Sequence, residues 1–358
     1  MMDDQRTSDY RRVQITGRGS YVISLPKKWV SDLGLSKGER VAILRESDGS
    51  LSLIPKEYER KEETREIEFH VQRNMDPQSI MRRLVSLYLV GYNTIKIMLE
   101  ENRFSPVRRD ILREFVRKKL MGTEIVTESS NEIFLQVLLS YPQLTAENAL
   151  RRMATIAEWM HKDAVQSLRE KNGELVDEVA RMDDEVDRFG FYVVRQLKTA
   201  VRDPRIVKEL GLKSLVDCLG YRLVVKSVER AADHAVLVAK NLVKGSINKQ
   251  LLDRIQAMSD FASMTFDTAM KSLYNRDYQM ADAVLSKAGK IESLEAEAID
   301  EISKSRLGSE DTSSLRLVLE SLRRISEYGC DIAEVVLNLT VIEMTKSILG
   351  TKQIVSKS

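Results

Sequence analysis

Two pairs of carboxylates dominate the chemistry that this sequence could carry. Asp183 and Asp187 stand four residues apart in one predicted helix, and Glu229 and Asp233 have the same spacing in the next. Residues four apart lie on one face of a helix, so each pair stacks two negative charges. Such a pair destabilises an isolated helix by about 0.2–0.5 kcal/mol, which a bound cation or flanking arginines would offset.

The lengths of the two helices predict that the pairs lie at one level. If the first helix ends near Arg202, Asp187 lies ~22 Å from its end, and if the second begins near Leu212, Glu229 lies ~26 Å along it. Antiparallel packing would then gather all four carboxylates into an all-oxygen site, which suits hard cations such as iron, manganese or magnesium. The alternative is a solvated helix face whose acids are paired with arginines and water. The candidates for that pairing are Arg188 and Arg230.

Length and composition limit the number of domains and the kinds of surface that the chain can have. The chain has 358 residues, with 56 Lys and Arg against 54 Asp and Glu, so we expect several domains and only a local nucleic-acid surface. No apolar run approaches the ~20 residues that span a bilayer, and the polar N-terminus does not resemble a secretion signal, which predicts a cytoplasmic protein without membrane insertion. Cys218 and Cys330 lack a partner motif and are interpreted as buried thiols.

Residues 11–55 are predicted to form short strands and one short helix after Pro26. About 45 residues with such strands cannot bury a core alone, so a second copy should complete it, which predicts a homodimer. Across residues 5–40, eight Lys or Arg against three acids favour salt-dependent binding to duplex DNA. The strand segments are 12–15, 21–25, 40–44 and 51–54. The candidate DNA-binding residues are Arg11, Arg12, Arg18, Lys27 and Lys28.

The order of motifs in this region carries a family resemblance. Arg12-Val13-Gln14-Ile15, a glycine-rich turn, residues 21–30 and Leu33-Gly34-Leu35 resemble the AbrB/SpoVT domain. The resemblance implies a swapped-hairpin β-barrel that dimerises and binds DNA, over residues 1–56. Val30 and Ser31 stand where that family often has two arginines. AbrB-like domains also occur in antitoxins, so an antitoxin-like DNA-binding protein is a further alternative.

The middle of the chain alternates between strand and helix. Residues 57–65 are almost wholly charged and are predicted to be a linker. Residues 66–140 read as strand, helix, strand, helix, strand, strand, with Asp76-Pro77 opening the first helix and Gly91 closing it. This pattern predicts a small α/β domain. We interpret it as a spacer or second dimerisation unit, with a ligand pocket as the alternative.

The remainder reads as six long helices in two sets of three, residues 145–245 and 246–348. The predicted fold is therefore multidomain: a dimeric β-barrel, an α/β domain and an all-α pair of three-helix bundles. In the second set, Glu292 lies ~21 Å before a predicted helix end, and Glu327 lies ~22 Å along the next helix. The second set is therefore also predicted to place two carboxylates at the same height along paired helices.

This duplicated pattern resembles the PhoU family of phosphate-uptake regulators. The resemblance implies metal binding by Asp183, Asp187, Glu229 and Asp233 in the first repeat. It implies only weak binding by Glu292 and Glu327 in the second, because Ala288 and Arg323 stand where the partner acids would be.

An AbrB-like domain joined to a PhoU-like region looks like archaeal phosphate regulators. The resemblance implies a DNA-binding transcriptional regulator of phosphate uptake with a metal-binding helical sensor or docking domain. The alternative is an accessory regulator that docks on a phosphate transporter or sensor kinase without binding DNA. An enzyme is not expected, because di-iron sites need two Glu-x-x-His motifs and only Glu158–His161 is present.

Overall fold

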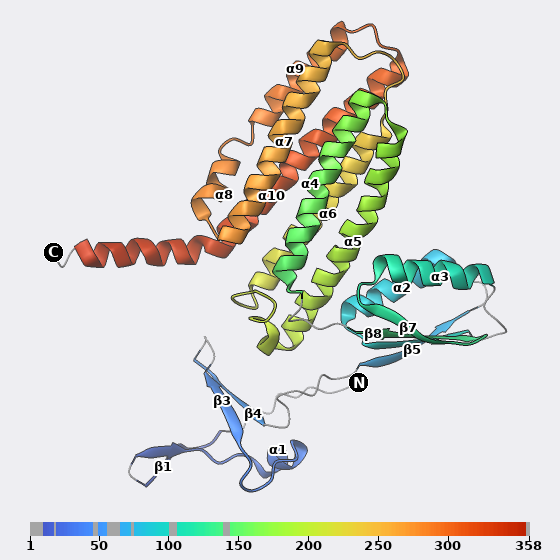
Figure 1. The fold of residues 1–358 in the computed structure, drawn as a ribbon. Helices are drawn as coiled ribbons and strands as arrows, with labels where there is room; N and C mark the ends of the chain where they lie inside the picture. Colours follow the sequence, from blue (N-terminus) through green and yellow to red (C-terminus); the bar gives the residue numbers. More distant parts are fainter. Residues whose placement is uncertain are drawn as a thin grey trace. The chain divides into compact units, whose positions relative to one another are not determined.

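A computed structural model of the chain (Figure 1) divides into two compact units, residues 1–64 and 65–358. The residues that it describes are 10–17, 19–45, 49–55, 65–72, 75–99, 106–138 and 144–355. Arg18 and all of the predicted linker except Arg65 lie outside the described residues.

The first unit consists of two hairpins and a short helix, close to the predicted segments. Strand β1 (Gln14–Thr16) pairs antiparallel with β2 (Ser20–Val22), and β3 (Val41–Arg45) pairs antiparallel with β4 (Leu51–Pro55). Helix α1 (Lys27–Asp32) begins after Pro26. The backbone of Gly17 has a φ of 60°, a left-handed conformation that glycine adopts without steric cost, so it suits the β1–β2 turn.

Large apolar side chains of this unit remain exposed. Tyr21 is 74% exposed, Ile15 68% and Ile43 65%, and Pro26 and Pro55 are the only buried residues among those described up to residue 55. The described residues of one copy therefore form no hydrophobic core in this region. The swapped-hairpin barrel and the homodimer stay predictions.

The second unit begins with the predicted α/β domain. Its sheet has the order β5-β6-β8-β7, with β5 and β6 parallel and the other pairs antiparallel. Both helices lie against one face of this sheet (Figure 1). The elements are β5 (Glu66–Val71), α2 (Pro77–Val90), β6 (Thr94–Leu99), α3 (Pro106–Lys119), β7 (Thr123–Glu128) and β8 (Glu132–Val137).

Local sequence explains why α2 begins and ends where it does. The Asp76 carboxylate accepts a hydrogen bond from Ser79 N at 3.1 Å, Pro77 occupies the first turn, and Gly91 ends the helix with a φ of 90°. The apolar face of α2, including Ile80 and Leu84, packs on the sheet in a core separate from that of the long helices.

The long helices follow the predicted pattern with two corrections. The third helix begins at Asp217 and not near Leu212, and the fifth is broken into α8 and α9 around residues 286–289. A short 3-10 helix, Pro204–Ile206, precedes α6. The helices are α4 (Ala146–Glu170), α5 (Gly173–Arg202), α6 (Asp217–Lys240), α7 (Lys249–Asn275), α8 (Tyr278–Leu285), α9 (Lys290–Lys304) and α10 (Ser309–Val355).

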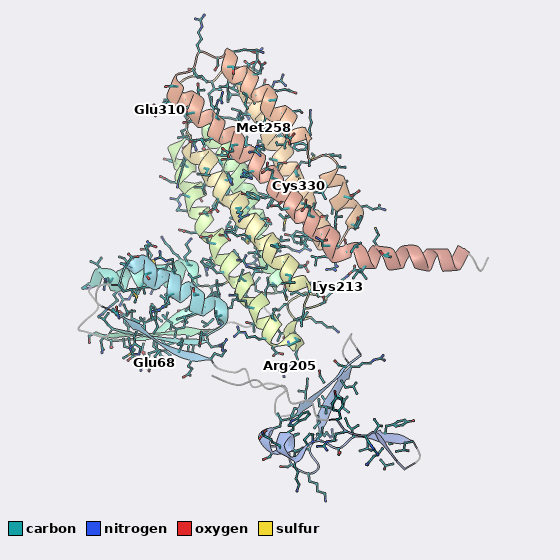
Figure 2. The ribbon with its side chains drawn as sticks, turned by 180° about the vertical axis from the view of Figure 1, so that it is seen from behind. Glu68, Arg205, Lys213, Met258, Glu310 and Cys330 are labelled. Carbon is teal, nitrogen blue, oxygen red and sulfur yellow. The ribbon has the colours of Figure 1, made fainter. Side chains whose placement is uncertain are left out.

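The two helix sets share one hydrophobic core. Helices α4, α5 and α6 pack together, as do α7, α8, α9 and α10, and α6 packs along α10 to join the sets. Met258 on α7 and Cys330 on α10 lie within this region, and Glu68 lies on the sheet of the α/β domain (Figure 2). Both cysteines are free, Cys218 buried and Cys330 half-buried. Of the described helices, none is both long and apolar enough to cross a membrane.

Candidate functional site

The carboxylates of the first repeat lie close enough to interact. Asp183, Asp184 and Asp187 project from α5, and Glu229 and Asp233 from α6. Burial raises the pKa of Asp183 to about 6, and the charges of Asp187 and Asp233 add to this effect. Partial burial also raises the pKa of Asp233, with contributions from Glu229 and Asp187. The acids of α5 and α6 thus lie at about the same height along the two helices, as predicted, and are brought close together.

One cation at this cluster comes from the α/β domain. Lys119 is the last residue of α3, and its Nζ lies 2.7 Å from Asp184 Oδ1 and 2.7 Å from Asp187 Oδ2. Burial by itself lowers the pKa of Lys119, but the hydrogen bonds and charges of Asp184 and Asp187 raise it overall. Sequence reasoning missed this lysine, although the basic last turn of α3 (Arg117, Lys118, Lys119) was a visible signal.

The arginines proposed as alternative partners do not pair with these acids, although the charge of Arg230 partly offsets the rise in the pKa of Asp233. Among the described residues, neither Arg188 nor Arg230 forms an ion pair with these carboxylates; Arg230 lies over the ring of Tyr328 at 5.9 Å, and Arg188 Nε is buried without a hydrogen-bond partner. On α6, Lys226 Nζ contacts Glu229 Oε1 at 2.6 Å. The His234 ring is directed to α10, 5.7 Å from that of Tyr328. Two lysines therefore neutralise part of the cluster.

The donor atoms fit a hard cation in kind, since carboxylate oxygens are its preferred ligands. Burial is the largest cause of the raised pKa of Asp183, and the charges of Asp187 and Asp233 add to it, while the charge of Lys119 lowers it. In the described side-chain arrangement, however, no three His, Cys, Asp or Glu side chains converge as metal ligands. The acids thus lie near one another, and Lys119 lies between Asp184 and Asp187.

The second repeat has a different arrangement. Arg323 on α10 bridges Glu295 Oε2, at 3.3 Å, and Glu327, to which Arg324 also pairs at 2.9 Å. Glu292 is exposed in the first turn of α9, so Glu295 takes the place that the sequence predicted for Glu292. A guanidinium between the two carboxylates does not fit a metal site.

The candidate DNA-binding residues all fall on exposed positions where they are described. Arg11 and Arg12 precede β1, and Lys27 and Lys28 open α1 beside the 41% exposed Trp29. Arg18 lies outside the described residues. The four that can be placed are thus accessible, and DNA binding through them stays a prediction.

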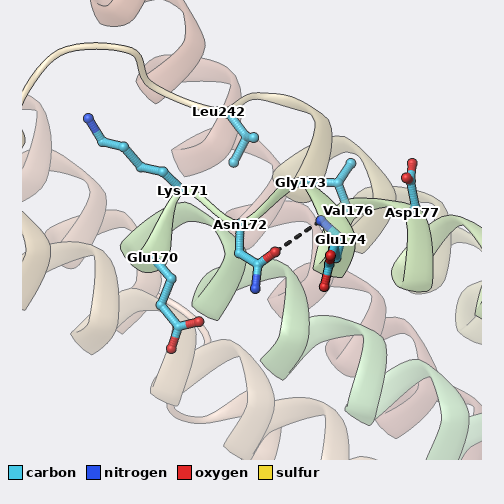
Figure 3. A pocket seen from close by; sticks show the side chains of 8 residues that line it. All are labelled: Glu170, Lys171, Asn172, Gly173, Glu174, Val176, Asp177 and Leu242. Atoms are coloured by element: carbon cyan, nitrogen blue, oxygen red, sulfur yellow. Dashed lines mark hydrogen bonds between the residues drawn. The ribbon is translucent and has the colours of Figure 1, made fainter.

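Other polar positions do not form a catalytic arrangement. His161 is buried in α4, with Nε2 2.8 Å from Ser259 Oγ of α7, so it is a core residue that joins the two repeats. A surface hollow at the α4–α5 turn (Figure 3) contains none of the clustered acids, and Asn172 in it accepts a hydrogen bond from Glu174 N at 3.0 Å. The hollow is lined by Glu170, Lys171, Asn172, Gly173, Glu174, Val176, Asp177 and Leu242.

Comparisons with known families agree with this division of the chain. The family described as PhoU domain matches residues 150–242 and 255–336, one match for each helix set. The family described as antidote-toxin recognition MazE, bacterial antitoxin, matches residues 14–61. Among curated proteins, none matches the chain.

Two solved structures are similar to the helical region. The phosphate transport system regulatory protein PhoU from Streptococcus pneumoniae is 15% identical, with a TM-score of 0.47 over 54% of this chain and 92% of that one. PhoU from Pseudomonas aeruginosa is 18% identical, with a TM-score of 0.49 over 54% of this chain and 94% of that one.

Proposed function

We propose that this chain, which carries two PhoU domain repeats behind a MazE/AbrB-like N-terminal domain, is a DNA-binding regulator of phosphate uptake. The observation that carries the proposal is the union of these two domain types in one chain. The PhoU repeats point to phosphate regulation and not to catalysis, and the N-terminal domain supplies the contact with DNA. We expect the helical region to sense a metal ion or to dock on transport or signalling components.

Charge and exposure of the N-terminal unit support DNA binding. Arg12, Lys27 and Lys28 are exposed, and their charges would neutralise phosphates and release counterions. The uncovered apolar side chains, such as Ile15 and Tyr21, favour a homodimer, because a second copy would remove them from water. A dimer would also double the number of basic side chains presented to one duplex.

The test is the salt dependence of duplex binding by the full chain, followed by fluorescence anisotropy. Each phosphate contact contributes about −0.9 to the slope of log K against log salt, so Arg12→Ala with Lys28→Ala should flatten a dimer's slope by about 3.6. A control pair, Arg82→Ala with Lys162→Ala, removes equal charge from exposed positions of the second unit.

Three outcomes separate the readings. A slope that the Arg12 and Lys28 changes leave unaltered would remove these residues from the interface. Absence of duplex binding at low salt would favour the accessory regulator that acts through a transporter or sensor kinase. An equal change in the control pair would indicate a general charge effect and no specific surface.

The match to an antitoxin family supports a second candidate, in which the N-terminal domain also binds a toxin protein. A partner of this kind should copurify in fixed proportion with the chain from its native cells and inhibit growth when expressed alone. Loss of the partner after deletion of residues 1–56, with DNA binding intact in the whole complex, would assign both roles to one domain.

For the metal, we propose that Asp183, Asp187, Glu229 and Asp233 hold a hard cation such as iron, manganese or magnesium. Such a cation would supply positive charge beside Asp183, whose pKa is raised first by burial and then by the charges of Asp187 and Asp233. The residues themselves would fix α5 against α6 at the level of the cluster. Glu292 and Glu327 are not part of this proposal, because Arg323 already neutralises Glu327.

A further inference from the structure

Helix α6 begins with an uncovered apolar stripe. Val216, Leu219 and Leu223 are 68%, 70% and 60% exposed, and their spacing of three and four residues places them on one face of the helix. Leu215, in the turn before the helix, is also exposed. In the other long helices, the described large apolar side chains that are exposed occur singly, except for the pair at 341–342 on α10. We call Leu215, Val216, Leu219 and Leu223 the α6 stripe.

Ile342 extends the α6 stripe onto α10. The two helices touch at Gly220, where an added Cβ atom would lie 3.0 Å from a side-chain carbon of Leu339. Ile342 follows Leu339 by three residues and is exposed, so it lies on the solvent side of this contact. The combined patch presents roughly 400 Å² of apolar surface, within the range of the largest patches on monomeric proteins, which often mark interaction sites.

The neighbouring helix α5, by contrast, has a partner within the chain. Arg195 on α5 is 1% exposed and donates hydrogen bonds to Tyr88 O and, at 2.9 Å, to Tyr92 O at the end of α2. Phe191 of α5 also packs against the core of the α/β domain. The α/β domain therefore covers α5, whereas the described part of the chain supplies no cover for the α6 stripe.

We propose that the α6 stripe is a homodimer interface in which α6 packs antiparallel against α6 of a second copy, with Leu219 at the two-fold axis. A two-fold interface must be complementary to itself, so a residue before the axis meets the residue that lies equally far beyond it. Around Leu219, this rule pairs Leu215 with Leu223. It pairs Val216 with Arg222, whose aliphatic stem can cover an apolar side chain. The α6 stripe is therefore self-complementary.

The charges around the stripe fit a second copy better than a strongly charged surface. Lys213 (Figure 2) places its Nζ 3.0 Å from Glu343 Oε2, and Lys226 Nζ lies 2.6 Å from Glu229 Oε1, so both lysines are neutralised. Arg222 is exposed and forms no ion pair within the described part of the chain. The antiparallel arrangement brings Arg222 of one copy toward the 44% exposed Glu343 carboxylate of the other.

The size of the patch fits an interface that works together with another contact between the copies. A stable interface buries about 800 Å² per partner, about twice the apolar area of the patch, so polar side chains at its rim would supply the rest. The stripe belongs to the second compact unit and can pair without the N-terminal unit. If the N-terminal units also dimerise, the second copy is held nearby at an effective concentration of order millimolar, which favours pairing of the stripes.

The experiment traps the interface by crosslinking cysteines of the full-length protein with a short bismaleimide. In Leu219→Cys, two thiols meet at the axis, so crosslinking between copies should be at least about tenfold faster than in a variant whose thiols are far apart. Leu237→Cys is that matched control, because Leu237 is exposed on the same face of α6, ~27 Å along the helix. Wild type, with Cys218 buried and Cys330 half-buried, gives the background.

Selective crosslinking at residue 219 is the expected result, and adding Leu223→Glu should abolish it. Equal yields from Leu219→Cys and Leu237→Cys, with a dimer in sedimentation equilibrium, would overturn the α6 interface and leave the N-terminal dimer in place. A monomeric full-length chain would overturn both. An apolar dye that binds wild type but not Leu219→Ser, without crosslinking at residue 219, would show a stripe open to a different protein or a lipid surface and would overturn the pairing of copies.

Discussion

The two helix repeats neutralise their acids with cations of different origin. In the first repeat, Lys119 reaches Asp184 and Asp187 from another domain. In the second, Arg323 pairs with Glu295 and with Glu327 on its own helix. An ammonium on a flexible side chain can withdraw alone, whereas a guanidinium held between two helices is a fixed part of their packing. Both repeats thus place acids on paired helices, but the first is neutralised partly from another domain and the second from within its own helices.

The largest expected effect comes from converting the second repeat toward the first. Arg323→Glu breaks two ion pairs and adds a like charge, which in a site with 29% exposure should destabilise the protein by about 3 kcal/mol. Urea denaturation in the presence of a chelator measures this loss. Arg324→Glu, at a more exposed position, should cost about 1 kcal/mol. Equal losses in the two variants would contradict the special place of Arg323.

The next effect concerns metal-linked stability of the first repeat. At a Mn²⁺ concentration 100 times the dissociation constant, wild type should gain about 2.7 kcal/mol, seen as a higher melting temperature. Asp187→Asn and Asp233→Asn should lose most of this gain. Glu292→Gln should keep it, because Glu292 is exposed in the second repeat. Identical metal content in all four proteins would exclude the site.

A pH effect tests whether the two repeats unfold together. Burial lowers the pKa of His161 to about 4, below an unfolded value near 6.5, so the stability that neutral His161 contributes is complete above pH 6.5 and is lost as the pH falls toward 4.

Between pH 7 and pH 5 this loss should be about 2 kcal/mol. In denaturation measured at both pH values, His161→Gln should lose that much less stability than wild type, and a variant of the exposed His70 should behave as wild type. Because His161 bonds Ser259 across the repeats, a transition that splits in two at pH 5 would show that they unfold separately.

The smallest expected effect is at Arg230. The sequence placed it among possible partners of the acids, but its guanidinium lies over Tyr328 and not in an ion pair with Asp233. Arg230→Met should change the free energy of unfolding by less than about 0.5 kcal/mol and leave Mn²⁺ affinity unchanged. A loss as large as that of Asp187→Asn would restore the arginine to the cluster.

Local signals predicted most of the fold. Capping residues such as Asp76 and Gly91 are short-range features, so the order of the α/β elements and both ends of their first helix were predicted correctly. The break between α8 and α9 was missed because residues 286–289 contain no proline and continue a helical pattern. The substitution of Glu295 for Glu292 has a related cause, since counting residues from helix ends assumes that both helices end at one level.

The acidic cluster of the first repeat also shows that contacts within consecutive helices can be predicted from the sequence, whereas contacts between domains cannot. Helical spacing was sufficient to bring Asp183, Asp187 and Asp233 together, because it depends only on two consecutive helices. Lys119 is 68 residues from Asp187 and lies in the α/β domain, which has a separate core. The basic last turn of α3 is visible in the sequence, but no periodicity relates positions that meet only through domain packing, so the carboxylates that Lys119 contacts could not be predicted.

The buried guanidinium of Arg195 gives the chain an order of assembly. During synthesis the α/β domain leaves the ribosome before α5 and can fold as a unit, so the carbonyls of Tyr88 and Tyr92 are in place when Arg195 arrives. A shorter chain beginning at α4 would have Arg195 without these acceptors and Phe191 uncovered. The α/β domain is thus a template on which the first long helices complete their folding.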